Sequence, residues 1–137
     1  MTTMSSDSSR TYSSNEKGRH AELLTQTALI ANGWEVLEPV TTEPYDLAIR
    51  RKDGDRDTYY VQVKTVKRRD DKRYGAPYLV VRGTKNNGEV YSKEEADYFA
   101  AVYEGNVYLF PNREITEYWT RADQVESKWK RIDTFLK

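Results

Sequence analysis

Four polar side chains in the sequence carry the groups that bind a hard cation and a phosphate. They are two carboxylates, one amide and one ammonium, from Glu22, Asp46, Gln62 and Lys64. Carboxylate and amide oxygens are the ligands that Mg²⁺ and Mn²⁺ prefer. A cation held there would polarise a phosphate oxygen, and a lysine beside it would orient the attacking water or stabilise added negative charge. The chemistry we expect is hydrolysis of a phosphodiester.

A predicted β-hairpin brings three of these side chains together. Residues 45–50 and 59–66 both alternate in side-chain character, and the turn signal Asp53-Gly54-Asp55 lies between them. A hairpin centred on Gly54 pairs residues whose numbers sum to about 108. This pairing fixes which side chains share a face.

The pairing places Asp46 opposite Gln62. Because side chains alternate along a strand, Lys64 lies on the same face, and the backbone carbonyl of Val63 is close to it. Glu22, on a preceding helix, adds a second carboxylate. We therefore expect Glu22, Asp46, Gln62 and Val63 to provide the metal ligands.

Each of these residues also has a structural interpretation. Glu22 could be an ordinary acid on a helix surface, and Asp46 could end a turn begun at Pro44. Gln62 and Lys64 could form the solvated face of an amphipathic strand. Against this, Asp is a poor strand former, and the second strand lies between other β segments, where Lys needs a reason.

The elements that must position these residues follow from patterning. Ser13 and Glu16 form a capping box, which predicts a helix from there to about Asn32, with Gly33 ending it. Ala21, Leu24, Ala28 and Ala31 form its apolar stripe. Patterning further predicts strands at 34–37, 78–82 and 107–110 and helices at 93–103 and 120–135.

Composition narrows the class of protein. Length fits one domain, which we expect over residues 15–137 after a flexible Ser-rich tail at 1–14. The chain has no Cys and one His, which excludes a structural zinc site. No segment is apolar enough to be a signal peptide or to cross a membrane, so we expect a soluble, cytoplasmic protein.

In order and spacing, these motifs resemble the PD-(D/E)XK nuclease superfamily, and more narrowly the small group I intron-encoded homing endonucleases, which carry Gln in the same place. The resemblance covers roughly Glu16 to Pro111. It is carried by Lys17-Gly18 with Glu22, Pro44-Tyr45-Asp46-Leu47, Val61-Gln62-Val63-Lys64-Thr65, Tyr91 to Phe99, and Tyr108-Leu109-Phe110-Pro111.

The resemblance implies an α/β (α+β) fold with a restriction-endonuclease-like core, a central mixed sheet of about four strands flanked by helices. It implies a Mg²⁺-dependent endonuclease (Mn²⁺ possible) that acts on double-stranded or branched DNA. It also implies a homodimer or higher homo-oligomer, because two active sites are needed to cut two strands. Trp119, Trp129 and Phe135 are expected in the core or in an oligomer interface.

Net charge is zero, so DNA binding needs a local concentration of positive charge. The segment 67–73, predicted to be a loop directly after the catalytic strand, provides it. Its default interpretation is a solvated loop, but its position favours contacts with the DNA backbone. The expected DNA-binding residues are Lys17, Lys67, Arg68, Arg69, Lys72 and Arg73.

Gln62 keeps a second function open. An amide removes one negative charge from the metal site and is a weaker ligand than a carboxylate, so a non-catalytic DNA-binding or inhibitory module with the nuclease fold is the alternative. A pure protein-interaction domain is disfavoured by the four-residue set.

Overall fold

The computed structural model describes residues 11–53, 57–71, 73 and 75–136, with only the backbone for Asp71. Most of the tail predicted at 1–14, namely residues 1–10, lies outside the described residues. Among the described residues, no helix combines the length and the apolar character that crossing a membrane requires.

The predicted N-terminal helix is confirmed as α1, Ser14–Ala31. Ser13 Oγ accepts a hydrogen bond from the Glu16 amide at 3.1 Å, and the Glu16 carboxylate accepts one from the Ser13 amide at 3.0 Å. This reciprocal cap satisfies amides that the first turn leaves unpaired. Gly33, at φ +86°, ends the helix in a conformation that favours glycine.

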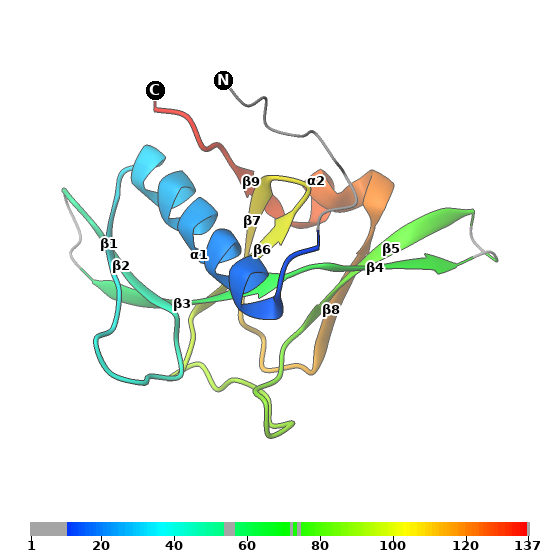
Figure 1. Ribbon diagram of the computed structural model, residues 1–137. Coiled ribbons are helices and arrows are strands. Elements are labelled where there is room, and N and C mark those ends of the chain that lie inside the picture. Colours follow the sequence, from blue (N-terminus) through cyan, green and yellow to red (C-terminus); the bar gives the residue numbers. More distant parts are fainter. Residues whose placement is uncertain (1–10, 54–56, 72, 74, 137) are drawn as a thin grey trace.

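Helix α1 covers one face of a six-stranded mixed sheet, which confirms the expected fold class with six strands in place of four (Figure 1). Only β3 and β6 run parallel; the other neighbours are antiparallel. In spatial order the strands are β1 Trp34–Leu37, β2 Leu47–Arg51, β3 Thr58–Thr65, β6 Tyr98–Tyr103, β7 Asn106–Pro111 and β9 Lys130–Ile132.

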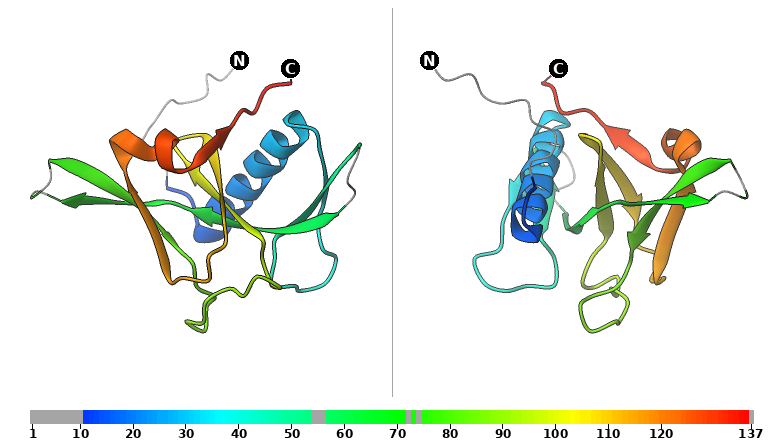
Figure 2. Two further views of the ribbon diagram at one scale, coloured as in Figure 1. Left: turned by 180° about the vertical axis from the view of Figure 1, so that it is seen from behind. Right: turned by 45° about the vertical axis from the view of Figure 1, so that its right-hand side comes forward.

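A second, three-stranded antiparallel sheet packs on the face opposite α1 (Figure 2). Alternation along β3 and β6 divides their apolar side chains between two cores. Val61, Val63 and Ala100 pack under α1, whereas Phe99 and Ala101 pack toward the second sheet. The strands of the second sheet are β4 Lys67–Asp71, β5 Ala76–Arg82 and β8 Glu117–Arg121.

The helix predicted at 93–103 is wrong, because residues 98–103 form β6 in the middle of the large sheet. Ala96, Phe99, Ala100 and Tyr103 do fit a helical spacing. A strand buried on both faces, however, also gives a continuous apolar run, and periodicity alone does not separate the two. Pairing with β3 on one side and β7 on the other decides for the strand.

Two other expectations are corrected. The helix predicted at 120–135 is replaced by the end of β8, the 3₁₀ turn η1 Ala122–Gln124, the short helix α2 Val125–Lys128, and β9. The basic segment 67–73 is mainly strand β4, paired with β5, instead of a loop. In both segments tertiary pairing outweighs local propensity.

Gly83, directly after β5, allows a close approach of two segments. A Cβ at this position would overlap the carbonyl oxygen of Ile115 and lie 2.8 Å from Cε2 of Tyr118. We expect Gly83→Ala to lower the free energy of unfolding by about 1–3 kcal/mol, as overpacking does. Gly18, inside α1 with open space around it, is the matched control.

Gly18→Ala should raise the free energy of unfolding by roughly 0.5–1 kcal/mol, because alanine is the better helix former. Urea denaturation of both variants measures the two effects. Equal stability of the two variants would contradict the packing described here.

Candidate functional site

The carboxylate of Asp46 is fixed at the point where β2 and β3 separate. The pairing Leu47 with Val61 is the last of the ladder and confirms the predicted hairpin register. Beyond it, the Asp46 amide donates to the carbonyl of Val61 at 3.0 Å, and the Val63 amide donates to Asp46 Oδ2 at 2.9 Å. The side chain therefore replaces the next residue pair of the ladder.

Gln62 and Lys64 lie on the face of β3 that looks away from α1. Their neighbours Val61 and Val63 belong to the core beneath the helix, so alternation turns the two polar side chains to the opposite face. Both are half-buried. Among the described residues, none forms a hydrogen bond with the side-chain amide of Gln62, which leaves this group available to a ligand.

Lys64 is held by the segment that follows β5. Its ammonium donates to the carbonyl of Thr84 at 3.2 Å and lies 5.1 Å from the ring centre of Tyr91. Tyr91 itself is 7% exposed. Burial, with the nearby carboxylates of Asp46 and Glu95, raises the pKa of Tyr91 to about 12, so its phenol stays neutral at physiological pH.

Glu22 approaches Asp46 from the helix side. The two side chains line one surface hollow of about 260 Å³, whose described lining includes neither Gln62 nor Lys64. Arg19 lies between Glu22, at 3.8 Å, and Glu38, at 2.6 Å. Asp46 is thus the shared member of the set, with Glu22 on one flank and Lys64 on the other.

Burial has opposite effects on the acid and base groups of this site. It raises the pKa of Asp46, while the Val63 hydrogen bond and the Lys64 charge oppose the rise. It also raises the pKa of Glu22, and the Asp46 carboxylate raises it further. Burial lowers the pKa of Lys64, which Asp46 opposes. Charged groups are being held at a desolvated site, which is a pattern typical of functional centres.

The donor set suits a hard cation that keeps part of its water shell. No group of three acidic, His or Cys side chains within the described part of the chain is placed to hold a metal. Glu22 and Asp46 supply two carboxylates, and Gln62 can add an amide oxygen. The Val63 carbonyl lies at the strand edge that its amide shares with Asp46. One or two carboxylates with retained waters is the usual coordination of Mg²⁺ in proteins.

Several contacts of the site were not predicted from sequence. Arg19, three residues before Glu22, could have been found from helical spacing. Thr84 and Tyr91 could not, because they meet Lys64 only through tertiary packing. Tyr45 stacks on Tyr60 with ring centres 4.2 Å apart and lines the same hollow as Asp46.

The expected DNA-binding residues do not form one cluster. Lys17 lines a separate hollow beside α1, with Thr65 and Glu104. Lys67, Arg68 and Arg69 lie on β4, and Arg73 lies in the turn after it, whereas Lys72 lies outside the described residues. Arg68 Nη1 is 3.4 Å from the Tyr103 hydroxyl, and Arg69 pairs with Glu117 at 3.4 Å.

Comparison with known proteins adds two findings. A sequence model of a family described as PD-(D/E)XK endonuclease matches residues 12–134. Among solved structures, that of the bacterial homing endonuclease I-Ssp6803I is similar, with a TM-score of 0.59 and 24% identity over 80% of this chain and 76% of that chain. This likeness bears on the fold and supports the restriction-endonuclease-like core. Curated proteins give no match.

The raised pKa of Asp46 has a consequence for stability. Because its folded-state pKa lies above its ordinary value, the charged carboxylate destabilises the fold above that pKa, and the effect disappears as pH falls through it. Asp46→Asn should therefore raise the free energy of unfolding at pH 7.5 in EDTA, on the order of 0.5–2 kcal/mol.

Denaturant unfolding at several pH values measures this gain, which should vanish in acid. Asp53→Asn, at an exposed position of the hairpin, is the control and should leave stability unchanged at every pH value. If Asp46→Asn instead lowers the free energy of unfolding at pH 7.5, burial does not destabilise the charged carboxylate and the account is wrong.

Proposed function

Because the chain belongs to the PD-(D/E)XK endonuclease family, we propose that it is a divalent-metal-dependent endonuclease that hydrolyses phosphodiester bonds of DNA. Glu22, Asp46, Gln62 and Lys64 are its catalytic residues. The observation that carries the proposal is the placement of Asp46, hydrogen-bonded to the Val63 amide and electrostatically coupled to both Glu22 and Lys64.

The metal ligands we propose are the Glu22 and Asp46 carboxylates, the Gln62 amide oxygen and the Val63 carbonyl. Bound Mg²⁺ or Mn²⁺ would supply a polarised phosphate oxygen and a water of lowered pKa. With Oδ2 of Asp46 held by Val63, Oδ1 is the oxygen that it offers to a ligand. Arg19 lies between Glu22 and Glu38 and thereby keeps Glu22 oriented toward the Asp46 carboxylate.

We assign Lys64 to the substrate phosphate. Its ammonium is anchored by the Thr84 carbonyl and the Tyr91 ring, so it is positioned before substrate arrives. From there it orients the attacking water or stabilises the negative charge that develops on the phosphate. The neutral Tyr91 covers one side of Lys64 and excludes water without adding a competing charge.

Gln62 favours a second candidate function. With an amide in place of an acid, the site has two carboxylates, and metal affinity depends more on the substrate phosphate. A DNA-binding or inhibitory module that retains the fold without cleavage is the alternative. Binding of DNA without nicking in either metal would favour it.

The substrate we propose is double-stranded or branched DNA, cut by a homodimer or higher homo-oligomer in the manner of a homing endonuclease or a junction resolvase. The structural likeness to a homing endonuclease supports the DNA substrate. One active site cleaves one DNA strand, and the active site of a second subunit cleaves the other strand.

Removing the central groups should abolish cleavage. Asp46→Ala and Lys64→Ala should each reduce nicking of supercoiled plasmid by roughly a thousandfold or more with Mg²⁺ or Mn²⁺, because the first removes a metal ligand and the second removes the ammonium that stabilises negative charge at the reacting phosphate. Circular dichroism should show both variants folded. Lys52→Ala, an exposed lysine of the hairpin, should cleave normally. Cleavage surviving both changes would mean that the site lies elsewhere.

The basic residues of β4 and its turn should contribute phosphate contacts. Changing Arg68, Arg69 and Arg73 together to Gln should reduce the slope of log affinity against log salt by roughly 2–3, because each phosphate contact contributes about 0.9. Fluorescence anisotropy of labelled duplex in EDTA measures it. The matched control changes Lys52, Lys130 and Arg131, none of which lies on β4 or in the turn after it, and an equal reduction there would contradict the assignment.

A further inference from the structure

The outer face of the three-stranded sheet is covered only in part: Val80 on this face is 3% exposed, and Lys128 of α2 reaches over the ring of Trp119. Leu79, Val81 and Tyr118 turn inward to the core, so alternation turns the intervening side chains outward. On that outer face, Trp119 is 51% exposed, although its strand neighbours Tyr118 and Thr120 are each 1% exposed. Tryptophan combines a large apolar ring with a polar N–H group, so a half-exposed Trp offers a ligand a large contact surface.

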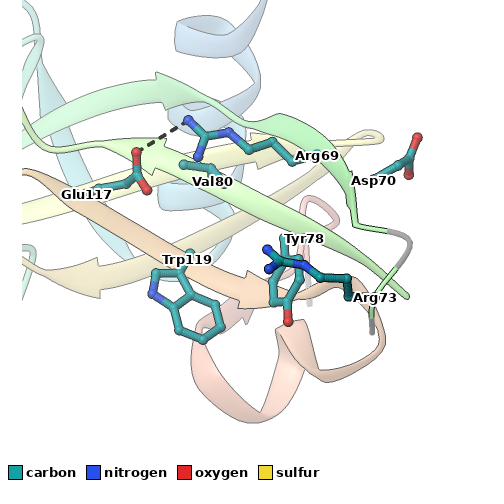
Figure 3. Close-up of a pocket in the computed structure, with 7 residues that line it drawn as sticks. All are labelled: Arg69, Asp70, Arg73, Tyr78, Val80, Glu117 and Trp119. Atoms are coloured by element: carbon teal, nitrogen blue, oxygen red, sulfur yellow. Dashed lines mark hydrogen bonds and ion pairs between the residues drawn. The ribbon is translucent and has the colours of Figure 1, made fainter. Parts of the chain in front are cut away.

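Trp119 forms one wall of a hollow of about 500 Å³, which we name the Trp119 hollow (Figure 3). The ring of Tyr78 packs against that of Trp119 with ring centres 5.4 Å apart, and Lys128 Nζ lies 4.4 Å from the indole centre. Arg73 and Arg69 also line the hollow, and in Figure 3 the guanidinium of Arg69 reaches toward Glu117. The hollow thus combines two aromatic rings with two guanidinium groups.

This combination matches the chemistry of a nucleotide. Aromatic side chains stack on bases whatever their sequence, and guanidinium groups bind phosphates through paired hydrogen bonds. The ion pair between Arg69 and Glu117 is exposed and therefore weak, so Arg69 can exchange it for a phosphate. The volume is at the scale of pockets for small ligands.

The charge of the outer face indicates whether its partner is a polynucleotide or a protein. By alternation the outer face presents Lys67, Arg69, Arg82 and Arg121. Among the described side chains, the acids beside them are Glu117, Asp70, which lines the same hollow, and Asp123, which pairs with Arg121 at 3.0 Å. Together with Arg73, the basic side chains outnumber these acids. A second copy of this chain docked face to face would bring like charges together, which is unfavourable. Tryptophan and arginine are also common in protein interfaces, so the charge excess is what favours DNA.

The outer face is continuous with the candidate active site. Arg82 lies at the end of β5, and its charge is close enough to Lys64 to affect it. Thr84, two residues later, receives the hydrogen bond from Lys64. Tyr78 is four residues along the same strand, roughly 13 Å from Arg82 at the usual strand rise, which is about four base steps of B-DNA.

We propose, on the basis of the nuclease function above, that the Trp119 hollow binds an unpaired nucleotide of the substrate DNA, with the base on Trp119 and Tyr78 and its phosphate on Arg69 and Arg73. In a duplex the faces of each base are covered by its neighbours, so only an unpaired base can stack on a side chain. The enzyme therefore prefers DNA with an unpaired strand a few nucleotides from the cut.

The test compares two labelled DNAs in EDTA, which prevents metal-dependent cleavage. One is a blunt duplex, and the other is the same duplex with a three-nucleotide single-stranded flap. Anisotropy should show tighter binding of the flap DNA by the wild type. Trp119→Ala should remove this preference, weakening flap binding by roughly 5- to 100-fold with little effect on the duplex. Trp119→Phe should retain most of it.

Tyr12→Ala, at an exposed aromatic residue of a different hollow, is the matched control and should keep the preference. A second measurement needs no variant. Iodide quenching of tryptophan fluorescence should fall when flap DNA binds, because Trp119 is far more exposed than Trp129 at 3%. Duplex DNA should give less protection.

Two binding results for Trp119→Ala would overturn the inference: an unchanged affinity for flap DNA, or an equal loss of affinity for flap and duplex DNA. A change in the oligomeric state of this variant, measured by light scattering, would also overturn it, because the face would then belong to an interface with a second copy of the chain. If the duplex is still bound and cleaved in these cases, the proposed nuclease function stands. Failure of the wild type to bind either DNA would instead refute that function as well.

Discussion

The hydrogen bond from the Val63 amide to Asp46 Oδ2 fixes the group on which the other contacts of the site depend. It forms where the ladder between β2 and β3 ends, so a side chain takes the place of a backbone acceptor. The register of the hairpin thereby determines where the carboxylate lies. The same register sends Gln62 and Lys64 to one face of β3, while Val61 and Val63 anchor the strand beneath α1.

Holding these groups in place opposes stability. Burial raises the pKa of Asp46 and Glu22 and lowers that of Lys64, so each group is less stable in its charged form than in water. Two packed cores on either side of the large sheet offset this and hold the strands rigid. A bound cation and a substrate phosphate would relieve the same electrostatic strain, which is how a fold can retain a desolvated acid pair for function.

The parts predictable from sequence were those set by local chemistry. The capping box at Ser13 fixed the start of α1, and the turn signal with alternating strands gave the register that places Asp46 opposite Gln62. The strand β6 was mistaken for a helix because an apolar run buried on both faces carries no period of two. The contacts of Lys64 with Thr84 and Tyr91, and the pairing of β5 with β8, arise from segments distant in the sequence, which no local pattern encodes.

The central claim is that Asp46, between Glu22 and Lys64, belongs to a divalent-metal centre. Anomalous diffraction from crystals soaked in Mn²⁺ tests it directly, with crystals of Asp46→Ala as the comparison. The account predicts one strong peak in contact with the Asp46 carboxylate in the wild type and none at that place in the variant. A peak at a site remote from Asp46, or the same peak in both crystals, would contradict it.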